Sequence, residues 1–189
     1  MLSNWPQQFG DCRPVAHELR VALPERWVRF HSLPRSKRWP QVESEYATIL
    51  ERHNCVLAEL TGSQRNVILL STGYSESSEP VRLEQSLWTL DPDARPWQSL
   101  LYDWDTDSDD RFFWHVFASE WEWLPGVFDP IVRLVADDAI ANIMIVDPDC
   151  RWLLHPYDGG MDVIAASSVA RDHLEASHQD WLSDHWLGL

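Results

Sequence analysis

Basic side chains gather between positions 26 and 38 of this chain, and they are the first group whose types and spacing suggest chemistry. Arginine guanidinium groups match the planar donor requirements of phosphate and carboxylate, so the stretch predicts a site for an anion. The candidate anion site combines basic residues here with two later carboxylates: Arg29, His31, Arg35, Arg38, Asp158 and Asp162. The competing interpretation is that these arginines pair with carboxylates of the chain itself.

A second group is an acidic run with one aromatic residue, and we predict that it contacts a partner. Its members are Asp103, Trp104, Asp105, Asp107, Asp109 and Asp110. A calcium-binding EF-hand counted from Asp103 requires glycine at the sixth position and glutamate at the twelfth, but Ser108 and Trp114 stand there. The run therefore indicates a solvated acidic loop, with weak, unspecific cation binding as the alternative. Trp104 is the best candidate for an exposed ring that anchors an interface.

Other chemistries lack their motifs. The chain has no HExxH or HxxxH spacing, no GxSxG elbow, no P-loop and no GxGxxG. Its three cysteines, Cys12, Cys55 and Cys150, are isolated and form no CxxC pair. His53 and Cys55 are two positions apart on an expected helix and so face different directions. We therefore predict no metal site and no cofactor, and the residues favour a non-catalytic protein over an enzyme.

The charge is uneven along the chain. The formal net charge is −15; residues 1–65 carry nine Lys or Arg against seven Asp or Glu, whereas residues 66–189 carry six against 23. Such an acidic surface repels phosphate backbones, so we expect a basic protein partner and no nucleic acid. No apolar run reaches the roughly 20 residues of a membrane span, and the first residues lack a secretion signal. These features favour a cytoplasmic protein without membrane contact, a monomer or a weak dimer.

Hydrophobic periodicity predicts one α+β domain over residues 1–189, with residues 1–25 as a loosely structured lead-in. The expected strands are 26–31, 66–72, 86–90, 97–102, 112–118 continuing by alternation to Trp123, 142–146, 151–155 and 161–165. The expected helices are 41–60, 130–139 and one that begins at Ser167 or Ser168. Because tight turns join most strands, we predict a twisted, mostly antiparallel sheet with a C-terminal three-strand meander, packed by about three helices.

The turn at 157–160 has two interpretations. Tyr157-Asp158-Gly159-Gly160 is typical of a hairpin in which glycines supply positive φ. Alternatively, Asp158 and Asp162 would be paired catalytic carboxylates. The residue types are those that a hairpin backbone demands, so the structural interpretation is preferred.

Four stretches of the chain resemble a bacterial family that is defined only as a domain of unknown function, DUF3885. They are 27–34 (WVRFHSLP), 45–54, 155–164 (HPYDGGMDVI) and 180–182 (DWL), and the likeness covers most of residues 26–186. The resemblance implies a small soluble bacterial α+β protein, and it carries no established activity or catalytic residue. In size, acidity and mixed architecture the chain is also similar to bacterial toxin-immunity proteins, with which it shares no motif.

Two functions follow as hypotheses. The first is a non-catalytic acidic protein-binding module, an immunity-type inhibitor of a basic protein, because acidic and basic surfaces attract each other over long distances. The second is a small enzyme or ligand sensor that binds an anionic small molecule through the basic cluster. A structure discriminates between them, because the second requires those arginines to be available in a pocket.

Overall fold

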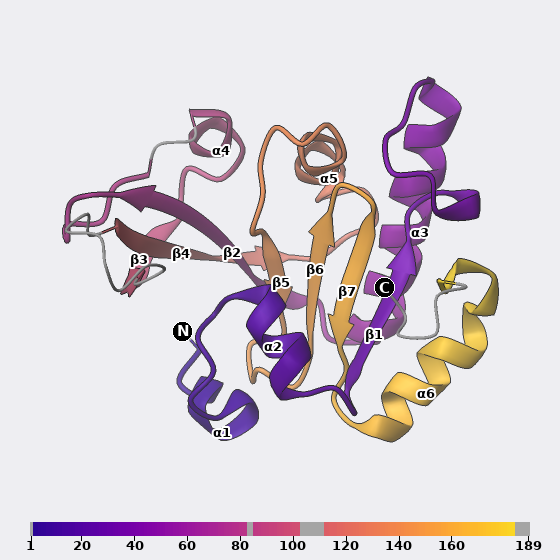
Figure 1. Ribbon diagram of the computed structural model, residues 1–189, viewed down its shortest axis with the longest axis horizontal. Coiled ribbons are helices and arrows are strands. Elements are labelled where there is room, and N and C mark those ends of the chain that lie inside the picture. The colour runs from indigo at the N-terminus through magenta and orange to yellow at the C-terminus, as the bar shows by residue number, and fades with distance from the viewer. Residues whose placement is uncertain (1, 83–84, 103–111, 184–189) are drawn as a thin grey trace, which may run out of the picture.

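The computed structural model describes residues 2–82, 85–102 and 112–183, and these form one twisted antiparallel sheet with helices on both faces (Figure 1). The strands are β1 (Trp27–His31), β2 (Asn66–Ser75), β3 (Arg95–Tyr102), β4 (Phe112–Glu122), β5 (Met144–Val146), β6 (Leu153–Tyr157) and β7 (Gly160–Ile164). The helices are α1 (Trp5–Phe9), α2 (Ala16–Ala22), α3 (Glu43–Thr61), α4 (Gln85–Leu90), α5 (Asp129–Ala136) and α6 (Ser168–Ser177). Two short 3₁₀ helices, η1 (Pro34–Ser36) and η2 (Gln179–Trp181), complete the described elements.

The strands follow the order β1-β7-β6-β5-β2-β4-β3, and every neighbouring pair is antiparallel. The α+β prediction and the C-terminal meander β5-β6-β7 are therefore confirmed. Strand β1 lies near the start of the chain but pairs with β7, which lies near the other end. This pairing brings the basic N-terminal stretch beside the acidic C-terminal one.

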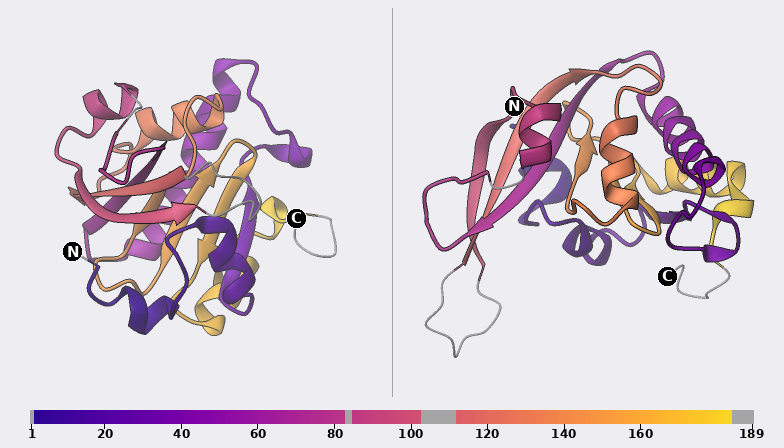
Figure 2. Two further views of the ribbon diagram at one scale, coloured as in Figure 1. Left: turned by 60° about the vertical axis from the view of Figure 1, so that its left-hand side comes forward. Right: turned by 90° about the horizontal axis from the view of Figure 1, so that it is seen from above.

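The sheet separates two hydrophobic cores, because successive side chains of a strand point to opposite faces. Along β2, Val67 and Leu69 enter the core under α3, α4, α5 and α6, whereas Ile68 and Leu70 enter the core under α1 and α2. Figure 2 shows α1 and α2 on one side of the sheet and α3 and α5 on the other. β2 is thus buried on both faces, as its continuous apolar run predicts.

The N-terminal segment differs from the expected loose lead-in. Residues 5–9 and 16–22 are helices, and Trp5, Phe9 and Leu19 are 5%, 2% and 0% exposed. The Trp5 indole also donates a hydrogen bond to the carbonyl of Cys12 at 2.9 Å. Helices this short are unstable alone and form because their apolar faces cover the sheet, and that tertiary contribution is invisible in a proline-rich sequence.

A second correction concerns residues 86–90, where we expected a strand and the structure has helix α4. Leu87, which is 1% exposed, and Leu90 both face the core at a three-residue spacing, while Trp88 is 55% exposed. That spacing is helical, but the aromatic and β-branched residues between the leucines favoured a strand. With α1 and α2, this brings the described α-helices to six instead of about three.

The hairpin turn after β6 is present, but its glycines serve a different purpose from the one expected. Neither Gly159 nor Gly160 has positive φ. A Cβ atom at Gly160 would lie 2.2 Å from the carbonyl oxygen of Phe30, so the glycine permits β1 to approach β7. The expected helices 41–60 and 130–139 correspond to α3 and α5, and the Ser167 hydroxyl caps α6 by accepting from the amide of Ala170.

Within the described part of the chain, no helix combines the length and the apolar character that crossing a membrane requires. The longest is α3 with 19 residues, and it carries charged residues at several positions.

Replacing Phe9 tests whether the N-terminal helices belong to the folded core. The change Phe9→Ala should lower the free energy of unfolding by about 3 kcal/mol, because it removes a fully buried ring. Val21→Ala, at a side chain that is 74% exposed on α2, is the matched control and should have little effect. Urea denaturation followed by tryptophan fluorescence measures both; an unchanged midpoint for Phe9→Ala would show that the segment is not part of the cooperative unit.

The buried His53 should make stability depend on pH. Burial lowers the pKa of His53 to about 4, and its Nδ1 donates to the carbonyl of Ile49 at 2.8 Å. Between pH 6.5 and 4 the unfolded chain therefore binds a proton that the folded chain does not, and stability falls as the pH falls. His53→Gln should remove roughly 3 kcal/mol of this pH dependence, which denaturation at pH 7 and pH 4.5 measures. His173→Gln, on the surface of α6, is the control that should retain it.

Candidate functional site

Arg29 and Asp162 form a buried ion pair at the centre of the basic cluster. The antiparallel register places them opposite each other on β1 and β7, although they are 133 residues apart in sequence. Arg29 Nε and Nη2 donate to the two carboxylate oxygens at 2.7 and 2.8 Å, and the side chains are only 14% and 7% exposed. Burial opposes the charge on Arg29, but the hydrogen bond and charge of Asp162 raise its pKa overall.

Aromatic and imidazole rings surround this pair. The Arg29 guanidinium lies 4.8 Å from the centre of the Tyr157 ring and 5.5 Å from that of Trp27. His155, on β6, is the cross-strand partner of Asp162 on its other side, and its Nδ1 donates to the carbonyl of Ile143 at 2.7 Å. Burial lowers the pKa of His155 and raises the pKa of Tyr157 to about 12, so both side chains are neutral at physiological pH.

The second arginine of the cluster is also paired. Arg38 binds both carboxylate oxygens of Asp158 through Nε and Nη2, the latter at 3.1 Å, and this contact raises the pKa of Arg38. The structure thus brings Arg29, Arg38, Asp158 and Asp162 together as two bidentate pairs, with each guanidinium facing a carboxylate of the chain. An added anion would have to compete with a carboxylate that is already in place.

The other two members of the cluster, His31 and Arg35, are not part of either pair. The carbonyl of His31 accepts a hydrogen bond from Arg52 at 2.7 Å, and the ring is half-buried at the end of β1. Arg35 is exposed in η1 with φ of 58°. No ion pair involves Arg35 among the residues that the structure describes.

The acidic run that we predicted to contact a partner, Asp103 to Asp110, lies outside the described residues. Contact between this run and a partner therefore stays a prediction from the sequence.

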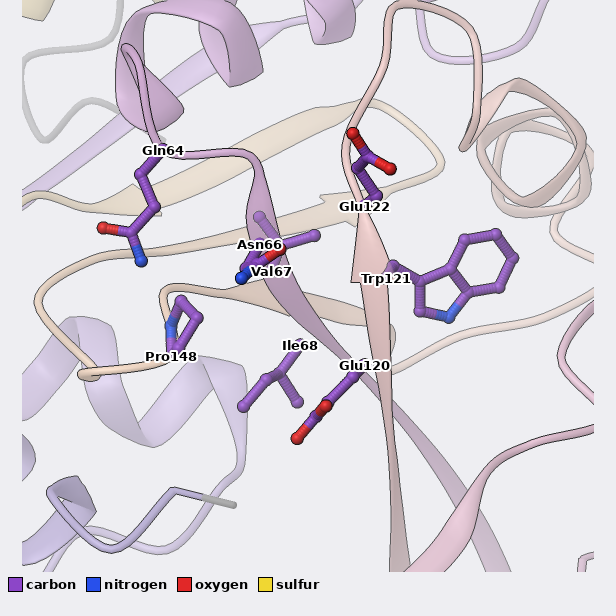
Figure 3. A pocket seen from close by; sticks show the side chains of 8 residues that line it. All are labelled: Gln64, Asn66, Val67, Ile68, Glu120, Trp121, Glu122 and Pro148. Atoms are coloured by element: carbon purple, nitrogen blue, oxygen red, sulfur yellow. The ribbon is translucent and has the colours of Figure 1, made fainter.

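A different acidic site is present on the described surface. A pocket of about 350 Å³ lies over the beginning of β2 and the end of β4, and eight residues line it (Figure 3). Register explains the arrangement: Asn66 and Ile68 on β2 lie opposite Glu122 and Glu120 on β4, so these four side chains share one face of the sheet. Trp121 points to the other side of the strand in Figure 3, and its indole donates to the Ser119 hydroxyl at 2.9 Å.

The two glutamates of this pocket are exposed and weakly engaged. Glu122 lies 3.9 Å from Arg65, and both side chains of that pair are more than 60% exposed. Glu120 has no ion pair within the described ranges. Ile68 lines the pocket although it is only 3% exposed, and Gln64 and Pro148 lie on the side opposite Glu120 and Glu122. Carboxylates beside apolar surface suit a long basic side chain, whose stem is apolar and whose end is charged.

Comparison with known proteins can now be set beside this geometry. The family model described as a domain of unknown function, DUF3885, matches residues 15–186. The chain belongs to the DUF3885 family. No curated protein and no solved structure matches it. The DUF3885 match extends the resemblance found in the sequence by eleven residues toward the N-terminus, and it includes both arginine–aspartate pairs and the Glu120 pocket.

The sequence indicates which residues belong to the arginine cluster of this DUF3885 protein, but it does not decide whether the arginines bind a ligand or pair with aspartates of the chain. The sequence placed Arg29, Arg38, Asp158 and Asp162 in one candidate anion site, and the structure pairs them with one another, which is the alternative that the sequence left open. Glu120 and Glu122 lie on one face of β4, but nothing in the sequence marks that face as the site of a pocket. The pocket also needs Gln64 and Pro148 as walls, and neither residue is adjacent to Glu120 or Glu122 in the sequence.

Breaking the buried ion pair should cost far more than breaking an exposed one. Arg29→Met leaves the Asp162 carboxylate buried without its cation, and we expect a loss of about 3–5 kcal/mol in the free energy of unfolding. Arg95→Met, which removes a 3.8 Å surface pair with Asp93, should change it by less than about 1 kcal/mol. Urea denaturation measures both variants.

The double variant Arg29→Met/Asp162→Leu removes both charges and should recover much of the lost stability. If Arg29→Met alone is as stable as the unmodified protein, the pair does not hold β1 against β7.

Proposed function

We propose that this DUF3885 protein is a non-catalytic binding module whose acidic surface binds a basic protein, in the manner of an immunity-type inhibitor. The observation that carries the proposal is the pocket in which Glu120 and Glu122 stand beside Ile68 with little internal neutralisation. The prediction from the sequence that the acidic run at 103–110 contacts a partner belongs to the same proposal.

The use of basic side chains supports it. The structure describes fourteen of the fifteen Lys and Arg residues, all except Arg111, and ten of these lie within 4.0 Å of a carboxylate of the chain. Arg26 and Arg52 instead donate to main-chain carbonyls. Positive charge is therefore largely paired within the chain, while the described part of the chain holds 23 Asp and Glu residues against 14 Lys and Arg residues.

The pocket has a size and chemistry that suit a lysine or arginine side chain. Its two carboxylates would meet the charged end, and Ile68 would contact the methylene stem. An acidic surface of this kind accelerates association with a basic protein, because attraction acts before the surfaces touch. Salt should weaken that acceleration, since it screens charges over about 10 Å.

The alternative function, binding of a small anion by Arg29, His31, Arg35 and Arg38, receives less support. Two of its guanidinium groups already hold Asp162 and Asp158 in bidentate contacts. Displacing these carboxylates would leave them without partners, and Asp162 is buried.

A charge-matched pair of variants tests the proposal. Glu120→Gln/Glu122→Gln removes the two pocket charges, whereas Glu76→Gln/Glu79→Gln removes two charges from an exposed loop elsewhere. Affinity capture at low salt from a lysate of the source organism should recover a basic protein with the unmodified chain. Binding of that purified protein should then weaken about 10-fold or more for the pocket variant, and much less for the loop variant.

The salt dependence of the association rate supplies the second measurement. We expect the rate constant to fall steeply as salt increases. Recovery of no basic partner, or equal affinity for the pocket variant and the unmodified protein, contradicts the proposal.

A further inference from the structure

Three side chains of different chemistry converge between α3 and the end of α6. Cys55 and Glu59 are four positions apart on α3 and therefore lie on one face of that helix. His178 follows the last turn of α6, and its ring reaches Glu59 near the end of α3. The thiol, a carboxylate oxygen and an imidazole nitrogen all lie within 4.8 Å of one another.

The imidazole is held firmly in this position. The backbone amide of His178 donates to the carbonyl of Leu174 at 3.1 Å, which ends α6. Its ring stacks on Trp181 with centres 4.0 Å apart and meets the edge of Phe30 at 5.6 Å. His178 is 8% exposed, and its Nε2 points at Glu59 Oε1 at 2.7 Å. A ring fixed by packing presents its nitrogen without losing freedom when it binds a ligand.

The three donor atoms suit a metal ion of intermediate softness. The Cys55 sulfur lies 3.8 Å from Glu59 Oε1, which in turn lies 2.7 Å from His178 Nε2. Around a tetrahedral zinc ion, neighbouring ligand atoms are separated by roughly 3.3–3.6 Å, given the usual bond lengths. A zinc ion held by all three groups would require Glu59 Oε1 to withdraw from His178 Nε2, from 2.7 Å to about 3.3 Å. Hard cations such as Ca²⁺ and Mg²⁺ prefer oxygen ligands alone.

We propose that Cys55, Glu59 and His178 form a binding site for Zn²⁺ or a similar divalent transition-metal ion. Three protein ligands leave a fourth tetrahedral position for water or a small ligand. Beside the cluster, Glu59 also lines a pocket of about 370 Å³ whose other walls include Trp152, His173 and Leu174. This proposal does not depend on the proposed protein-binding function.

The same geometry has a simpler interpretation, in which Glu59 and His178 form an ion pair that joins α3 to α6. The two interpretations differ at Cys55. In the ion pair the thiol is a weak hydrogen-bond donor to Glu59, whereas in the proposed zinc or cobalt site its thiolate is a metal ligand. The decisive variant is therefore Cys55→Ser, which lies at the helix surface and should leave the fold intact.

Isothermal titration of the purified, reduced full-length protein with ZnCl₂ is the first test. We expect one ion per chain with a dissociation constant of about 1 µM or tighter. Titration with Co²⁺ should give the thiolate-to-cobalt charge-transfer absorption and the intense visible bands of a tetrahedral site. Cys55→Ser should abolish the charge-transfer band and weaken zinc binding about 10-fold or more, and Glu59→Gln should weaken it similarly.

The controls lie on the same elements or carry the same groups. Cys12→Ser removes another thiol, and His173→Gln removes the neighbouring α6 histidine; both should bind zinc as the unmodified protein does. Ca²⁺ and Mg²⁺ should produce no signal. Circular dichroism melting verifies that each variant is folded. Absence of zinc binding at tens of micromolar, or undiminished binding by Cys55→Ser, overturns the proposal.

Discussion

The attachment of β1 to β7 is the constraint on which the rest of the structure depends. Strand β1 lies at the edge of the sheet and has one strand neighbour, so its position is set by the register with β7. Arg29 and Asp162 fix that register, because a slip of one residue would turn the guanidinium toward the hydrophobic core. Gly160 permits β1 to approach β7 closely. The segments before and after β1 are positioned by this strand.

This attachment also decides how charge is distributed. Arg29 and Arg38 are brought to the carboxylates of the 157–162 hairpin and pair with them there. The remaining surface keeps an excess of carboxylates, and at Glu120 and Glu122 two of them line a hollow. The arginine cluster that looked most like a ligand site in the sequence thus supports the fold, and the acidic character outside becomes the property that a partner would meet.

Local sequence patterns predicted much of the fold. The meander followed from turns and apolar runs, α3 from helical periodicity, and the start of α6 from its capping serine. The sequence did not predict the helices that depend on tertiary packing: α1 and α2 form because they cover the sheet. It also did not predict α4, whose residues favour helix and strand about equally. For the sites, single segments supplied the correct residue types, but the meeting of Cys55 with His178 depends on how α6 lies against α3, which no local spacing records.

The pairing of β1 with β7 has a consequence for synthesis of the protein. The two strands lie at opposite ends of the sequence, so the emerging chain holds an unpaired β1 until the last hairpin has left the ribosome. Contacts between distant segments also slow folding, because the chain loses the entropy of closing a long loop before these contacts can stabilise it. During that interval the apolar side chains of β1, Val28 and Phe30, lack the burial that they have in the folded protein, and exposed apolar surface of this kind promotes aggregation.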